Sequence, residues 1–172
     1  SFNKNLLNNR FLPTKGDLIL FETDIGISNK AIYANTLFNY NKYFSMNNLF
    51  YWNLIVHSEG VNILNSKVPI SRYKKFGGYS TLRGYDDNQF ESTQFSISTL
   101  EFNYILNFNS HPFLFLDIAS TKIDVFHNNM IGYGFGLKKD NNNLSLNISY
   151  AFSKQKTLFS EGALHIKVVS KF

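Results

Sequence analysis

Alternation of apolar and polar side chains is the feature that most constrains the fold of this chain. The segments 131–139, 144–152 and 164–172 each place large apolar residues at every second position and glycine, serine, asparagine, histidine or lysine between them. A period of two puts the two sets on opposite faces of a β-strand. A soluble barrel turns its apolar face inward, but here the second face is small or polar. The pattern therefore predicts an all-β, antiparallel transmembrane β-barrel whose apolar face meets lipid.

Composition supports strands rather than helices as the membrane-crossing elements. The chain has 172 residues, enough for one domain, 1–172, and its mean hydropathy is only -0.19 although 17% of its residues are aromatic. No stretch approaches the roughly 18 apolar residues that a spanning helix needs. Charged residues make up 17% of the chain, below the quarter that is usual in soluble domains. Breaks at proline, glycine and asparagine divide the sequence into about eight segments, which predicts about eight strands.

The first half of the chain gives the same pattern less cleanly. Strands are predicted at 17–27, 31–44 and 48–58, and polar hairpin turns at 46–48, 109–112 and 140–143. The segment of about 60–93 is too long for a simple hairpin connection. Long loops within compact domains are usually functional, so this segment is the first place to look for a site.

Charge and ligand chemistry favour no nucleic-acid, metal or cofactor partner. The net charge is +5, but lysine and arginine are scattered through loops and strand ends, so nucleic acid is not an expected partner. Cysteine is absent and no set of residues has metal-ligand spacing, so neither a metal nor a cofactor is expected. Four histidines leave a lipid-modifying enzyme as a remote alternative. His57 and His165 fall on inward faces, whereas His111 and His127 lie at predicted strand ends and are expected to be exposed. No triad spacing stands out, so the chain is not expected to be an enzyme.

The long loop contains an unusual run, Phe76-Gly77-Gly78-Tyr79-Ser80-Thr81-Leu82-Arg83-Gly84-Tyr85. Glycines allow a backbone to fold tightly against other structure. An arginine held in such a fold usually pairs with a carboxylate. Glu101 and Asp117, in the next two predicted strands, are the candidates.

Five ordered motifs resemble the BamA/TamA/FhaC outer-membrane barrel superfamily (bacterial surface antigen family), in the C-terminal half of its barrel. The segment 9–16 resembles the strand entry R-x-x-P-T-[RK]-G, and the loop run resembles the motif GG followed by [VIL]-R-G-[FY], which the family carries on its sixth extracellular loop. The segments 98–102, 115–119 and 132–137 resemble the three following strands, with Ala119 in place of the usual glycine. The C-terminal end resembles the outer-membrane β-signal, whose apolar positions form one side of a seam: Leu164, Ile166, Val168 and Phe172.

The resemblance implies that the loop folds back into the barrel lumen, where Arg83 pairs with Glu101 and Asp117. Alternation agrees, because Glu101 shares a face with Thr99, and the neighbouring positions of both acids are apolar. Two inward carboxylates on adjacent strands repel each other without a cation, and a guanidinium fits two carboxylates better than an ammonium. Such a pairing anchors the loop rather than performing chemistry.

The resemblance also implies an integral barrel of the bacterial outer membrane (an organellar outer membrane is less favoured) that acts in insertion or transport of outer-membrane proteins. Its expected partners are outer-membrane lipid and client proteins. A non-catalytic anchor or subunit barrel with the same fold is the alternative. Family barrels have sixteen strands preceded by POTRA modules, and no POTRA module is expected within this chain. The chain is therefore expected to be part of a longer protein, half of a barrel shared by two copies, or a closed miniature barrel. Because eight is a closable number of strands, the small barrel, stand-alone or excised, is slightly favoured. In a closed eight-stranded barrel the lumen is filled by its own side chains, so the loop would cap the mouth.

Overall fold

The computed structural model describes residues 1–9, 13–28, 31–64, 66–107, 109–121, 130–140, 144–154 and 161–170. Within them most residues lie in strands, and a short 3-10 turn, η1 (Ile70–Arg72), lies in the loop between β4 (Phe50–Ile63) and β7 (Gln94–Tyr104). In the part described, no helix is long and apolar enough to cross a membrane. The strands are β1 (Phe2–Asn5), β2 (Gly16–Ser28), β3 (Ala31–Ser45), β4 (Phe50–Ile63), β5 (Lys74–Phe76), β6 (Phe90–Ser92), β7 (Gln94–Tyr104), β8 (Ser110–Thr121), β9 (Met130–Asp140), β10 (Leu144–Ser153) and β11 (Ala163–Ser170).

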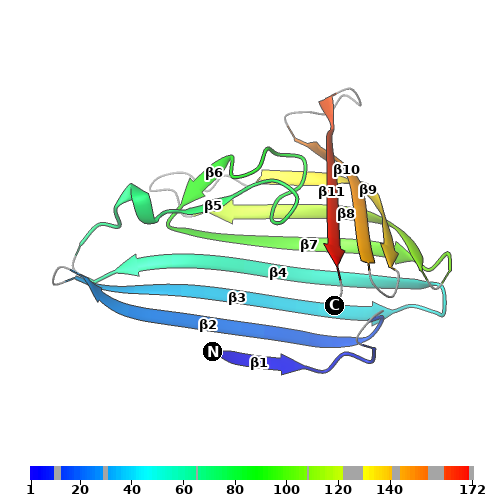
Figure 1. Ribbon diagram of the computed structural model, residues 1–172, viewed down its shortest axis with the longest axis horizontal. Helices are drawn as coiled ribbons and strands as arrows, with labels where there is room; N and C mark the ends of the chain where they lie inside the picture. Colours follow the sequence, from blue (N-terminus) through cyan, green and yellow to red (C-terminus); the bar gives the residue numbers. More distant parts are fainter. Residues whose placement is uncertain are drawn as a thin grey trace.

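Nine of these strands form one antiparallel sheet in the order β1-β2-β3-β4-β7-β8-β9-β10-β11. The sheet curls, so that β9, β10 and β11 stand across the face of the flatter β1–β7 portion, and the loop between β4 and β7 lies on the enclosed side (Figure 1). The antiparallel all-β architecture is as predicted. The sheet is open, with β1 and β11 at its two ends, so the closed eight-stranded barrel is not the form that this chain takes.

The ninth strand, β1, was not predicted from the sequence. Its four residues contain a single apolar side chain, Phe2, so they carry no readable periodicity. Pairing with β2, from Phe2 opposite Phe21 to Asn5 opposite Leu18, is what makes this segment extended.

Exposure along β7 and β8 follows the predicted alternation. Leu100, Leu116 and Ile118 are each 40% exposed on the outer face, and Leu114 is 58% exposed. The intervening positions on both strands are buried, with burial patterns that alternate residue by residue. These leucine and isoleucine side chains therefore face outward, which is the arrangement of a barrel wall in lipid.

The loop begins later than the sequence indicated, because β4 continues through Ile63 instead of ending near residue 58. Its two short strands, β5 and β6, pair with each other and form a small separate sheet. The loop packs onto the wall through a cluster of buried apolar side chains contributed by the loop, β7 and β8: Phe76, Leu82, Tyr85, Phe95, Ile97 and Ala119.

The predicted turn at 109–112 and the exposure of His111 were wrong. The hairpin closes earlier, where the backbone N–H of Ser110 donates to the Asn107 carbonyl and that of Leu106 donates to the Ser110 carbonyl. The chain is consequently already extended at His111, which lies in β8 opposite Lys138 and is 1% exposed. The prediction for His127 falls outside the described residues.

Candidate functional site

A tight turn in the loop delivers Arg83 to the barrel wall. Gly77 and Gly78 have φ values of 122° and 82°, in the region that favours glycine. The Gly77 N–H donates to Oγ1 of Thr81 at 2.8 Å, and the Thr81 hydroxyl donates to the Gly77 carbonyl at 2.9 Å. These bonds close the turn, and Leu82, fully buried in the cluster described above, fixes the position of the next residue, Arg83.

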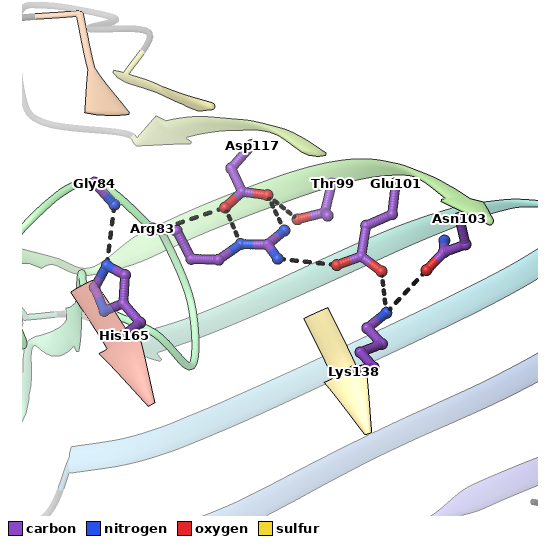
Figure 2. A network of polar contacts seen from close by, with 8 residues as sticks. All are labelled: Arg83, Gly84, Thr99, Glu101, Asn103, Asp117, Lys138 and His165. Carbon is purple, nitrogen blue, oxygen red and sulfur yellow. Dashed lines mark hydrogen bonds and ion pairs between the residues drawn. The ribbon is translucent and has the colours of Figure 1, made fainter. Parts of the chain in front are cut away.

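Arg83 and Asp117 form the centre of a buried network (Figure 2). Nε and Nη2 of Arg83 donate to the two Asp117 carboxylate oxygens, each at 2.8 Å. The Arg83 backbone N–H adds a third bond at 3.2 Å, and the Thr99 hydroxyl donates a fourth at 2.7 Å. Asp117 is fully buried and Arg83 is 7% exposed, so this bidentate pair is shielded from solvent.

Glu101 joins the same network from β7. One of its carboxylate oxygens accepts from Nη1 of Arg83 at 2.9 Å, and the other accepts from Nζ of Lys138 on β9. Lys138 also lies 3.5 Å from Oδ1 of Asn103. Two cations and two carboxylates therefore meet in one cluster with no net charge, in which the Lys138 side chain is 25% exposed and the other three are buried.

Aromatic rings complete the walls of this cluster. The Arg83 guanidinium carbon lies 3.6 Å from the ring centroid of Phe115, and Nζ of Lys138 lies 4.7 Å from that of Phe113. Both geometries are those of cation–π contacts. The rings have room because β9 presents glycine to them: a Cβ at Gly134 or Gly136 would overlap Phe115 or Phe113.

Arg83 and the next residue, Gly84, lie close to three further strands, β9, β10 and β11. A Cβ at Gly84, whose φ is 89°, would overlap the Phe152 carbonyl oxygen of β10, and one at Gly132 of β9 would overlap the Arg83 carbonyl oxygen. The Gly84 N–H donates to Nε2 of His165 on β11 at 3.3 Å (Figure 2). The loop tip thus contacts each strand from β7 to β11.

The chemistry of this site suits positioning. Desolvation disfavours the charged form of Arg83, but bonds and charge–charge attraction to Asp117 and Glu101 outweigh it, so the pKa of this loop arginine is raised above its ordinary value. Its proton is therefore not available for transfer. Among the described residues, no group of three histidine, aspartate or glutamate side chains is arranged to hold a metal. His57, on β4, contacts Asn39 and Glu59.

The structure brings Arg83, Glu101 and Asp117 together and places Tyr85 in the packed cluster beside them. It does not bring the β-signal residues to this site: Leu164, Ile166 and Val168 lie on the outer face of β11, each about 60% exposed. Phe172 and the motif residues 10–12 lie outside the described residues.

Three participants were not singled out from the sequence: Lys138, Phe115 and the site role of His165. The parity of β9 could have identified Lys138, because it shares the inward face with Gly132, Gly134 and Gly136. The contact of His165 with Gly84 joins residues 81 positions apart and has no local sequence signal.

Comparisons with known proteins give one family and one fold. A family model described as the Omp85 superfamily domain matches residues 1–162. A comparison with curated proteins found no match. Among solved structures, the crystal structure of BamA from Haemophilus ducreyi lacking POTRA domains 1-3 is similar to this chain with a TM-score of 0.77 and 16% identity. The match covers 98% of this chain and 40% of that chain, so this chain spans about two fifths of its length.

Proposed function

This chain belongs to the Omp85 superfamily, and on that premise we propose that it forms the C-terminal part of an outer-membrane barrel that inserts or transports outer-membrane proteins. The observation that supports this most is the buried network of Arg83, Glu101 and Asp117, which ties a long loop to the inner face of the wall. We infer that the network keeps the loop in the lumen and in register with the C-terminal strands.

Placement in an outer membrane has support from the outer face of β4 and β7. Near one end of these strands aromatic side chains gather: Phe50 stacks on Phe102 with ring centroids 5.4 Å apart, and the ring of Trp52 lies tilted against Phe102 at 4.8 Å. Aromatic rings at one end of an outward apolar face are typical of the membrane–water interface. We propose outer-membrane lipid as the partner of this face.

The end strand β11 offers a mechanism for acting on client proteins. It lies last in the sheet order and is paired with β10 over Ala163–Ser170. An end strand presents backbone groups that can pair with an incoming strand. We propose that the edge of β11 is where a client strand first adds, and that the anchored loop keeps the C-terminal strands in shape while it does so.

The test is the rate at which an unrelated outer-membrane barrel folds into liposomes that contain the intact protein. Wild type should accelerate folding over empty liposomes, and Arg83→Met should abolish most of that acceleration. Arg72→Met is the matched control, because Arg72 lies on the same loop and stacks on Tyr33, 4.3 Å from its ring centroid. No acceleration by the wild type would overturn the insertion proposal and favour a non-catalytic anchor or subunit.

A further inference from the structure

The inward face of β11 contacts the loop tip through two side chains. Nε2 of His165 accepts the Gly84 N–H at 3.3 Å, and the His165 ring lies 6.2 Å from the ring of Tyr79. Lys167, two residues along the same face, places Nζ 5.4 Å from the Tyr79 ring centroid. The end strand β11 is therefore held by contacts with the loop on its lumenal face, in addition to its pairing with β10.

The contact between Gly84 and His165 lies next to the ion cluster in the sequence. Arg83 is bonded to β7 and β8 through Glu101 and Asp117, and the very next residue, Gly84, is bonded to β11 (Figure 2). Gly84 also lies close to β10, since a Cβ added at this position would overlap the Phe152 carbonyl oxygen. Loss of the bond between Gly84 and His165 would therefore release the end strand β11 from the loop, while the loop stays bonded to β7 and β8.

We propose that His165 is a positioning residue that latches the end strand β11 to the anchored loop, and that acid opens this latch. Only an unprotonated imidazole nitrogen can accept a hydrogen bond. An imidazolium would present a second N–H toward the Gly84 N–H, and the two donors would repel each other. Histidine is the side chain whose charge ordinarily changes within physiological pH.

Charged groups of both signs surround His165. Asp87 and Arg83 on the loop and Asp117 on β8 act on it electrostatically, and Lys167 follows it on β11. The Tyr79 phenol faces it from the loop. Ser149, its partner in register on β10, carries no charge. Burial of the ring and the charge of Arg83 oppose an imidazolium, whereas Asp87 and Asp117 favour it.

Opening the latch would change how easily a client strand reaches the edge of β11. This consequence rests on the proposed function, whereas the latch itself does not. With the latch closed, β11 is held by β10 and by the loop. With it open, β10 remains the hydrogen-bonded neighbour of β11 among the strands that the structure describes, and the end strand moves more freely. The contact itself can be tested without any client protein.

The experiment is hydrogen exchange of the peptide that contains Gly84, measured on the intact protein in lipid nanodiscs at about pH 7.5 and about pH 5, with protection corrected for the intrinsic exchange rate. His165→Gln replaces the accepting nitrogen with an amide oxygen that does not titrate, and His165→Leu removes the acceptor. His57→Gln is the matched control, a lumenal histidine on β4 whose partners are Asn39 and Glu59.

Wild type and His57→Gln should lose roughly fivefold in protection at the lower pH, the value of one net hydrogen bond of about 1 kcal/mol. His165→Gln should keep its protection at both pH values, and His165→Leu should lack it at both. Wild-type protection that is equal at both pH values, or a His165→Gln variant that loses protection with acid, would overturn the latch. If His165→Leu fails to fold, the Gln variant still decides. Failure of the wild type to accelerate client folding would sink the proposed function and leave the exchange result intact.

Discussion

Replacing Arg83 with methionine should release the loop from the wall at a large cost in stability. Methionine keeps most of the apolar stem of the side chain but removes the cation and the three side-chain bonds to Asp117 and Glu101. Glu101 would retain Lys138. Asp117, fully buried, would retain the Thr99 hydroxyl and the backbone N–H of residue 83, but no cation among its described contacts.

The loss follows from that asymmetry. Removing one partner of a buried ion pair costs about 3–5 kcal/mol, because the remaining charge stays desolvated. Arg83→Lys keeps the charge but cannot reproduce the bidentate geometry, so it should cost about 2 kcal/mol, the value of one lost charge-assisted hydrogen bond. Asp117→Asn should be far less harmful in the Arg83→Met background than in the wild type, since no unpaired carboxylate then remains.

The assay is chemical denaturation of the intact protein in bilayers. Trp52, the single tryptophan of this chain, reports unfolding of β4 by its fluorescence. The four proteins of the Arg83/Asp117 double-mutant cycle give the coupling free energy directly, and about 2–3 kcal/mol is expected. A coupling below about 0.5 kcal/mol would refute the claim that this ion pair holds the loop.

Four further substitutions test the surroundings of Arg83 in the same assay. Gly84→Ala should cost about 2 kcal/mol or more, because its backbone is left-handed and its new methyl would overlap the Phe152 carbonyl; a neutral result would mean that the tip does not lie against β10. Gly132→Ala should destabilise too, since its methyl would meet the Arg83 carbonyl, and protease cleavage of the loop should rise with it. Lys138→Met should cost only about 1–2 kcal/mol, because Glu101 keeps Arg83; a loss as large as that of Arg83→Met would reverse the ranking of the two cations. Phe115→Leu should cost about 1–2 kcal/mol through the lost cation–π contact and ring volume. The same substitution should cost less in the Arg83→Met variant than in the wild type.

The wall of the barrel was predictable because lipid and lumen impose opposite demands on alternate residues. The inward orientation of Glu101 and Asp117 follows directly from the apolar residues on either side of each. The same rule placed Leu164, Ile166 and Val168 on the outer face of β11. Such alternation involves only neighbouring residues, so it can be recognised from the sequence in any strand that is long enough to repeat it.

What the sequence did not reveal depends on contacts between distant segments. β1 is too short and polar to show a period and is defined by its pairing with β2. The turn before β8 closes at Asn107 and Ser110, so a histidine and a proline that resemble turn residues lie inside a strand. The contact of Gly84 with His165 requires the curl of the sheet, which brings β11 across to the loop.

One cysteine pair decides whether the sheet is open, with a lumen wide enough to hold the Arg83 loop. Cysteines would replace Val168 on β11 and Asn3 on β1, at the opposite end of the sheet order. The protein would then be oxidised in membranes. Val168 with Leu146, its register partner on β10, is the positive control. We expect the control pair to form an intrachain disulfide and the Asn3–Val168 pair to form none. An intrachain Asn3–Val168 bond would mean a closed small barrel, in which the loop could not be held as described.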